Sequence, residues 1–170
     1  MSGTTATILS AGSCSITASQ AGNANYFPAS STKSFTVNKA NQTASITSTA
    51  PTNAKIGGSS YTVAATATSG LTPALTIDAS SSAVCSISGS AVSFNGAGTC
   101  TVNANQSGNT NYNAASQVQQ SFAVSKNTQS ISFSSTAPPN AIVAGASYNV
   151  GATASSGLTV SFSAAAGSAG

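Results

Sequence analysis

The chain has 170 residues, of which 40% are hydrophobic and 3% are charged, against about 25% charged residues in an average soluble protein. Four lysines and one acidic residue give a net charge of +3, and there is no histidine, arginine, glutamate or tryptophan. Valine, isoleucine, tyrosine and phenylalanine nevertheless recur at regular spacing, which predicts a chain with a core rather than a disordered segment.

The charges are too few and too scattered for several classes of function. The lysines at positions 33, 39, 55 and 126 form no cluster of the kind that displaces counterions from nucleic acid, so we expect no nucleic-acid partner. No apolar run approaches the roughly 20 residues of a membrane helix, so we expect no membrane insertion. The first residues also lack the basic and apolar regions of a signal peptide.

The inventory of reactive side chains predicts that the protein is not an enzyme. Asp78 is the single acid, so no carboxylate pair exists for glycoside hydrolysis, and a Ser–His–Asp triad cannot form without histidine. A lysine-activated serine is the arrangement that the composition leaves open. One carboxylate is too few for a calcium site, and three cysteines without histidine match no zinc spacing. We therefore expect no metal and no cofactor, and interpret Asp78 as an acceptor in a turn.

A short motif in residues 1–40 returns later in the chain. Residues 12–26, "GSCSITASQAGNANY", place a cysteine on a strand-like run before a loop rich in asparagine, glutamine and glycine. Residues 98–112, "GTCTVNANQSGNTNY", repeat this order at an offset of 86. The following "SFTVNK" and "SFAVSK" match at an offset of 87. Residues 1–40 thus correspond to the C-terminal half of a repeat.

Alternating apolar and polar residues predict seven short strands in residues 41–126. Within one strand the apolar residues share a parity, as Cys100, Val102 and Ala104 do, so they should face the core together. Seven strands in about 86 residues predict an all-β, immunoglobulin-like antiparallel β-sandwich, with a small barrel as the alternative. The expected strands lie around residues 44–48, 61–67, 74–78, 84–88, 91–94, 100–104 and 118–124.

Residues 127–170 repeat the first half of this unit. Residues 129–158 are identical to residues 42–71 at 18 of 30 positions, at a constant offset of 87. The expected organisation is therefore a C-terminal half-repeat in 1–40, a complete repeat in 41–126 and an N-terminal half-repeat in 127–170. The two halves together omit only the counterparts of residues 84–86.

The motifs "TSTAPTNAKIGGSSYTVAATATSGL", "VCSISGSAVSFNGAGTCTV" and "ANQSGNTNYNAA" resemble bacterial immunoglobulin-like repeats. Such repeats form tandem arrays in large secreted and cell-surface proteins of bacteria, many of them adhesin-like. The resemblance implies an extracellular or bacterial cell-surface location, adjacent repeats as partners, and no catalytic residues.

The three cysteines allow one pair. Cys85 and Cys100 flank a hairpin within the complete repeat, which predicts a disulfide and an oxidising, extracytoplasmic setting. Two buried free thiols are the alternative. Cys14 is the counterpart of Cys100, and the counterpart of Cys85 falls among the omitted positions. We therefore predict that Cys14 is unpaired.

Three functions fit these observations. The first is a structural spacer, because no glycine- or proline-rich linker separates the repeats. The second is a module that binds a glycan or host surface through the asparagine-rich loop. The third is a head-to-tail fibre subunit completed by its half-repeats. The absence of a partner for Cys14 argues against this third function. For the loop we favour a structural corner, because it occurs twice. The candidate binding residues are Asn103, Asn105, Gln106, Asn109, Asn111 and Tyr112.

Overall fold

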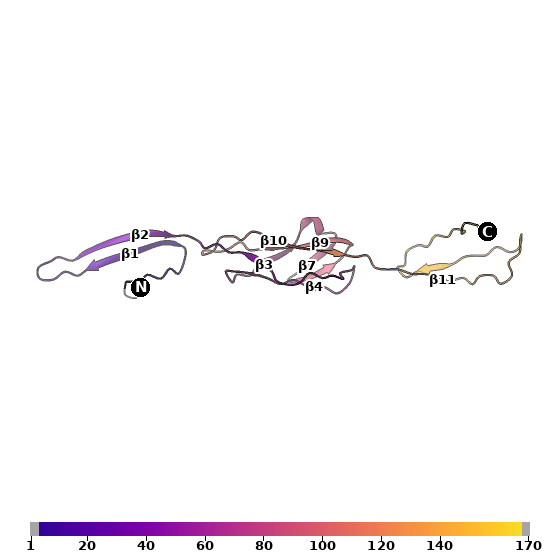
Figure 1. Ribbon diagram of the computed structural model, residues 1–170, viewed down its shortest axis with the longest axis horizontal. Coiled ribbons are helices and arrows are strands. Elements are labelled where there is room, and N and C mark those ends of the chain that lie inside the picture. Colours follow the sequence, from indigo (N-terminus) through magenta and orange to yellow (C-terminus); the bar gives the residue numbers. More distant parts are fainter. Residues whose placement is uncertain (1–3, 168–170) are drawn as a thin grey trace. The chain divides into compact units, whose positions relative to one another are not determined.

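The computed structural model describes residues 4–167 and is all-β, with antiparallel sheets (Figure 1). The chain divides into two compact units, one ending at Lys126 and the other beginning at Asn127. The strands are β1 (Gly12–Gln20), β2 (Ala29–Val37), β3 (Ala44–Ile46), β4 (Tyr61–Thr62), β5 (Ala65–Ala67), β6 (Ala74–Ile77), β7 (Cys85–Ser88), β8 (Ala91–Phe94), β9 (Gly98–Asn105), β10 (Val118–Val124), β11 (Ile131–Phe133) and β12 (Ala152–Ala154), with a 3-10 turn at Ala79–Ser81.

Residues 41–126 form two facing antiparallel layers. One layer has the strand order β10-β9-β6, and the other contains β4-β8-β7 and the short pair β3-β5. The single strand expected over residues 61–67 is divided in two, because its first part pairs with β8 and its last part with β3. Between them, the Ala64 N–H bonds the Ser48 hydroxyl at 3.0 Å instead of a neighbouring strand. This segment therefore links β3 to β8 across one layer.

The core lies between these layers and is made by the predicted inward positions. Cys100 and Val102 of β9 are fully buried opposite Val92 of β8. The Phe122 ring packs edge-on against Tyr61 and Phe94, with centroid distances of 5.5 and 5.9 Å, an arrangement that aromatic quadrupoles favour. Alternation along the strands thus placed the apolar side chains on the inner faces.

The disulfide between Cys85 and Cys100 joins the two layers. It connects β7 to β9 with a Cα–Cα distance of 5.8 Å, within the usual range for such bonds. Both cysteines are buried in the core, so the predicted pair is confirmed and the alternative of two free thiols is wrong. The bond closes a loop of the size that contributes about 3 kcal/mol to stability.

Strands β1 and β2 form a two-stranded hairpin that corresponds to β9 and β10. Strand β1 pairs with β2 over nine residues, from Gly12 with Val37 to Gln20 with Ala29 (Figure 1). Opposed hydroxyls on one face bond each other, as Ser15 and Ser34 do at 2.6 Å. Most of this hairpin is exposed, because it has no facing layer of its own among the described residues.

The second unit contains the pair β11–β12, the counterpart of β3–β5. The counterparts of β4 and β6 lie near residues 148–149 and 161–164, and they are not strands in the structure. In residues 41–126 those strands pair with β8 and β9. Since the second unit contains no counterparts of β8 and β9, its backbone has no ladder to join there.

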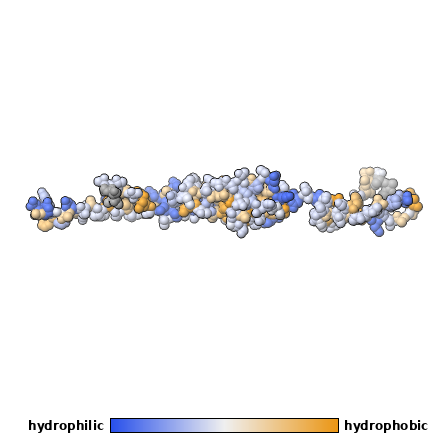
Figure 2. Space-filling view, turned by 90° about the horizontal axis from the view of Figure 1, so that it is seen from below, coloured by the Kyte–Doolittle hydropathy of each residue, from blue (hydrophilic) through white to orange (hydrophobic). Residues whose placement is uncertain are grey.

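Small polar and small apolar residues dominate the surface. Figure 2 shows a mostly pale face with scattered blue and orange residues, and only 3% of the residues are charged. Thr and Ser occupy outward strand positions, where the branched Cβ of Thr suits a pleated sheet.

Candidate functional site

The asparagine-rich loop between β9 and β10 is held by its own side chains. The Asn109 carboxamide oxygen accepts hydrogen bonds from the backbone N–H groups of Asn111 and Tyr112, at 2.8 and 3.0 Å. The Gln106 carboxamide oxygen accepts from the Gly108 N–H at 3.0 Å. Gly108 adopts φ +76, and a Cβ there would lie 2.3 Å from the Tyr112 carbonyl oxygen. These residue types therefore specify one rigid turn.

The loop between β1 and β2 has the same internal bonds. The Asn23 side chain accepts from the N–H groups of Asn25 and Tyr26, at 2.8 and 3.0 Å, and Gln20 accepts from Gly22 at 2.6 Å. Gly22 has φ +74, and a Cβ there would also meet a backbone carbonyl. Recurrence of this pattern shows that the turn forms from local sequence alone, whatever surrounds it.

The loop at 106–113 also binds the segment that enters the repeat. The Ala40 N–H donates to the Asn111 carbonyl oxygen at 2.8 Å, and the Asn113 N–H donates to the Ala40 carbonyl oxygen at 2.9 Å. Ala40 and Tyr112 thereby form a parallel β-bridge. The Lys39 ammonium donates to the Asn109 carbonyl oxygen at 2.8 Å. We call residues 39–42 together with 106–113 the junction clasp.

The Gln42 side chain connects the clasp to Ser69. Its Nε2 donates to the Asn113 carbonyl oxygen at 2.6 Å, while its Oε1 accepts from the Ser69 hydroxyl at 2.5 Å. The side chain is 7% exposed. A buried amide with both ends bonded resists displacement, since an unpaired end would cost about 1–3 kcal/mol. Gln42 therefore fixes the segment before β3 to the loop at 106–113 and to Ser69.

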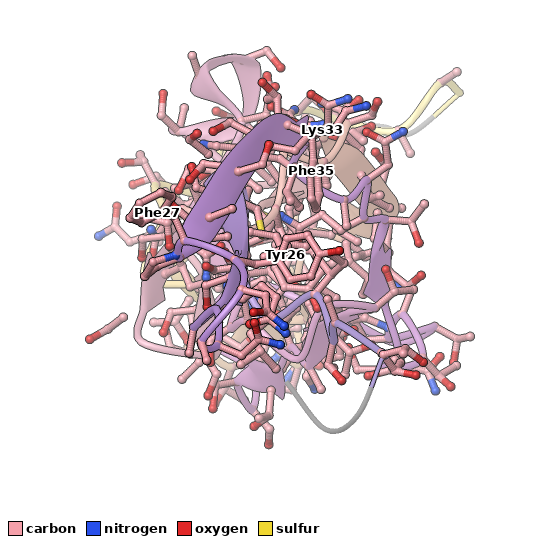
Figure 3. All side chains as sticks on the ribbon, turned by 90° about the vertical axis from the view of Figure 1, so that its left-hand side faces the viewer. Tyr26, Phe27, Lys33 and Phe35 are labelled. Carbon is pink, nitrogen blue, oxygen red and sulfur yellow. A yellow bond between two sulfur atoms is a disulfide. The ribbon has the colours of Figure 1, made fainter. Side chains whose placement is uncertain are left out.

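The clasp reaches the hairpin that precedes it. The Ala11 N–H donates to the Asn111 carboxamide oxygen at 3.0 Å. Ala11, Val37 and Tyr112 are among the residues that line a hollow of about 200 Å³ at this point. Asn111 and Tyr112 are partly buried, whereas Tyr26, the counterpart of Tyr112, is 75% exposed. Figure 3 shows Tyr26 and Phe27 at the end of the hairpin that faces the viewer.

The structure brings together four of the six predicted loop residues and separates two. Gln106, Asn109, Asn111 and Tyr112 belong to the clasp. Asn105 ends β9, and Asn103 lies within it. The Asn103 side chain bonds Asp78 and Gln119, so Asn103 and Asn105 belong to the strand, while the other four candidate residues belong to the loop. Along β9 the side chains point alternately to the two faces of the sheet, up to Asn105 at the start of the loop.

Sequence reasoning missed the other half of the clasp. Lys39, Ala40 and Gln42 bind the loop from outside it. One signal was present: Lys39 and Gln42 recur as Lys126 and Gln129 at the offset of 87. That recurrence marks two corresponding segments of the chain, but it does not show which loop they contact.

Asp78 acts as a structural acceptor, as predicted. It caps the 3-10 turn, where its Oδ1 accepts from the Ser80 hydroxyl at 2.6 Å and from the Ser80 N–H at 3.0 Å. These bonds, followed by one from Asn103, hold the pKa of Asp78 below its ordinary value of 3.8. The carboxylate therefore remains ionised and bound to the turn at neutral pH.

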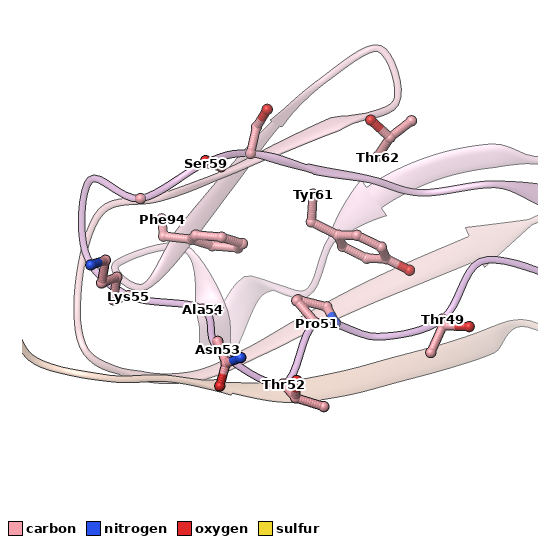
Figure 4. Close-up of a pocket in the computed structure, with 12 residues that line it drawn as sticks. Thr49, Pro51, Thr52, Asn53, Ala54, Lys55, Ser59, Tyr61, Thr62 and Phe94 are labelled. Carbon is pink, nitrogen blue, oxygen red and sulfur yellow. The ribbon is translucent and has the colours of Figure 1, made fainter.

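A shallow hollow lies beside the core. It encloses about 500 Å³ and is lined by residues of 49–62 together with Phe94. In Figure 4 the Tyr61 and Phe94 rings point into the space between its two backbone segments. The Tyr61 hydroxyl is already bonded to Ser48 and Gln120, at 2.5 and 2.7 Å. Lys55 is the charged side chain at its rim.

Cys14 is a free, partly buried thiol on β1. It occupies the position of Cys100, facing Phe35 across the hairpin as Cys100 faces Phe122. Among the described residues, no group of three or more Cys, Asp, Glu or His side chains could hold a metal ion. Across residues 4–167 no helix is long and apolar enough to cross a membrane. Comparison with protein families, curated proteins and solved structures finds no match for this chain.

Proposed function

We propose that this protein is a non-enzymatic structural spacer, in which immunoglobulin-like repeats are joined end to end by the junction clasp. The observation that carries the proposal is the pair of backbone hydrogen bonds between Ala40 and the loop, with Lys39 and Gln42 on either side. A segment bonded along its length cannot act as a free hinge. Successive repeats would therefore keep a fixed orientation, which a rod requires.

The strand order supports an immunoglobulin-like topology. We count β4 and β5 as two parts of one strand, which gives seven strands numbered along the chain from β3 to β10. One layer then has the spatial order first (β3), second (β5 and β4), fifth (β8) and fourth (β7). The other layer contains the third, sixth and seventh strands. Constant-type immunoglobulin domains have this ABED and CFG arrangement. Here the disulfide joins the fourth and sixth strands, instead of the second and sixth as in antibodies.

Shared local contacts support a repeat of about 86 residues. The hydroxyls of Ser48 and Tyr61 bond at 2.5 Å, and those of Ser135 and Tyr148 bond at 2.6 Å. The Ser69 hydroxyl bonds Gln42, as the Ser156 hydroxyl bonds Gln129. The same contacts at a constant offset of 87 support one module written more than once.

An extracellular or bacterial cell-surface location completes the proposal. The disulfide is compatible with such a setting. A surface almost without charge and without paired catalytic groups suits a passive element better than an enzyme. Adjacent repeats are the proposed partners.

Glycan binding by the loop is the weaker alternative. Carboxamides that recognise sugars must present unused donors and acceptors. Here the carboxamide oxygens of Gln106, Asn109 and Asn111 accept backbone hydrogen bonds within the chain. The loop thus already uses the carboxamide oxygens that could accept hydrogen bonds from a glycan.

Spin-label distances test the clasp in the full chain. Nitroxides at Ser30→Cys and Ser121→Cys, in a Cys14→Ser background, report on the hairpin relative to the repeat. We expect a narrow distance distribution that broadens at least twofold when Gln42→Ala and Asn111→Ala are added. Asn25→Ala, the matched change in the other loop, should leave the width unchanged. A broad distribution in the parent protein would contradict a fixed junction.

A further inference from the structure

The chain enters and leaves the intact repeat (residues 41–126) at opposite ends of β10. At the entry, Ala40 forms a parallel bridge with Tyr112, in the loop between β9 and β10. At the exit, Lys55 forms a parallel bridge with Ser125, the residue after β10. A strand of seven residues such as β10 spans about 23 Å. Tension on the chain therefore pulls the two ends of the repeat in opposite directions along β10.

The exit bridge consists of two backbone hydrogen bonds. The Ser125 N–H donates to the Ala54 carbonyl oxygen at 2.9 Å, and the Ile56 N–H donates to the Ser125 carbonyl oxygen at 3.3 Å. Because the two segments run parallel, tension draws residues 54–56 back toward the entry and draws Ser125 away from it. The hydrogen bonds run across the strands. Sliding of one segment along the other thus stretches both bonds together instead of opening them in sequence.

The entry bridge has the same bonding pattern. The Ala40 N–H donates to the Asn111 carbonyl oxygen at 2.8 Å, and the Asn113 N–H donates to the Ala40 carbonyl oxygen at 2.9 Å. Ala40 thus bonds the residues on either side of its partner, as Ser125 bonds those on either side of Lys55. Both bridges are therefore loaded along the strand direction when the chain is pulled.

The exit bridge is also the better protected of the two. Ala54 and Val124 are 5% and 3% exposed and belong to the core, and Ile56 packs against it. The Gly57 N–H donates to the Phe94 carbonyl oxygen at 2.9 Å, so this segment bonds the layer of β8 as well as Ser125. Burial keeps away the water that would otherwise replace a stretched hydrogen bond. The exit bridge should therefore resist tension longer than the exposed entry bridge.

The disulfide limits how far the repeat can extend once it opens. Cys85 and Cys100 are 15 positions apart in sequence, with a Cα–Cα distance of 5.8 Å. Tension passes across the bond, so the residues between the two cysteines cannot lengthen. At about 3.4 Å for each extended residue, the bond withholds about 45 Å of extension.

We propose that the intact repeat is a load-bearing module, in which the bridge between Ser125 and residues 54–56 carries tension in shear and the Cys85–Cys100 disulfide limits extension. This role goes beyond that of a spacer, because a spacer needs a fixed orientation between repeats and no resistance to pulling. Resistance to pulling is a property of the unfolding rate, and it depends on the direction in which the bonds are loaded.

Single-molecule force spectroscopy of the full chain tests the dependence on direction. In a Cys14→Ser background that keeps the native disulfide, DNA handles at Asn38→Cys and Thr128→Cys load both bridges along their strands. Handles at Asn38→Cys and Ser116→Cys instead pull at one end of β10, and open the same contacts one after another. We expect the first geometry to unfold at a force at least twofold higher. Equal forces in the two geometries would overturn the proposal.

A proline at the exit bridge tests which bonds carry the load. Ser125→Pro removes the N–H that donates to Ala54. In the first geometry it should lower the unfolding force at least 1.5-fold. In the second geometry the force should stay unchanged, because opening begins at the other end of β10. An equal fall in both geometries would reflect a general loss of stability, and would overturn the role of this bridge.

The extension on unfolding tests the limit set by the disulfide. Both cysteines are buried, so dithiothreitol should leave the first unfolding step unchanged and then add a second step of about 45 Å. A single step of unchanged length at every force would overturn this limit. A flexible junction together with a high unfolding force, or the reverse, would separate this proposal from the spacer role.

Discussion

The hairpin β1–β2 and its counterpart β9–β10 have the same pairing and the same turn but different burial. Cys14 faces Phe35 in one, and Cys100 faces Phe122 in the other. Cys100 is 0% exposed, whereas Cys14 is only partly buried. Hydrogen bonding along the backbone therefore forms without the core, and the facing layer supplies the burial.

The same comparison separates two sources of stability. Ladder and turn bonds contribute modestly, since each replaces a bond to water and yields about 0.5–1.5 kcal/mol net. Removal of apolar side chains from water contributes about 1.5–3 kcal/mol for each large residue. The intact repeat has both sources, while the open hairpin has mainly the first. Matched substitutions in the two copies should show this difference directly.

Loss of the central aromatic ring should have the largest effect. Phe122→Ala leaves a cavity beside Tyr61 and Phe94 and should lower the free energy of unfolding by about 3–5 kcal/mol. Phe35→Ala, at the matched but exposed position, should cost about 1 kcal/mol or less at low protein concentration. Urea unfolding, monitored by hydrogen exchange in each of the two hairpins, measures the loss of unfolding free energy in both variants. Equal losses would contradict the assignment of the core.

Removal of the disulfide should be the next largest change. Cys85→Ala with Cys100→Ala should lower the unfolding free energy by about 3 kcal/mol, because the unfolded chain gains conformational freedom. Cys14→Ala, at the counterpart of Cys100, should change it by less than about 0.5 kcal/mol. Thermal unfolding with and without a reductant provides the measurement. A large effect of Cys14→Ala would show that the hairpin contributes to the folded core.

Glycine substitutions should distinguish strain from collision in the loops. Gly108→Ala places a Cβ against the Tyr112 carbonyl oxygen and should cost about 2–3 kcal/mol. Gly70 has a similar φ of +78 but open space around it, so Gly70→Ala should cost about 1 kcal/mol from backbone strain alone. Denaturant midpoints of the two variants give the difference. Identical midpoints would show that the turn adapts to the added methyl group.

Acid should produce the smallest change, and only in the intact repeat. The pKa of Asp78 is lowered in the folded state by its bonds to Ser80 and Asn103. Its contribution is therefore present above pH 3.8 and is lost as pH falls through the lower folded value. Asp78→Asn should flatten this part of the stability profile. The measurement is the unfolding midpoint of Asp78→Asn and of the parent between pH 5 and pH 2, near the usual carboxyl range. The same pH dependence in both proteins would contradict the bonds of Asp78 to Ser80 and Asn103.

Local sequence determined most of the secondary structure and the turn. Apolar residues at alternate positions place Cys100 and Val102 on one face of a strand, because successive side chains of a strand point to opposite sides. The motif with Gln, Gly and Asn folds alike at residues 20–26 and 106–112, since its hydrogen bonds run between near neighbours. For the same reason the repeat register could be read directly from the printed sequence.

Tertiary structure decided what local signals do not contain. Residues 61–67 divide into β4 and β5 because their partners, β8 and β3, approach from different parts of the chain. The loop at 106–113 binds Ala40 and Lys39, about 70 residues earlier, and no periodicity records such a contact. Burial, the disulfide across the layers and the clasp all depend on which surfaces meet. The sequence alone determined which side chains face inward, and packing determined which of them found a partner.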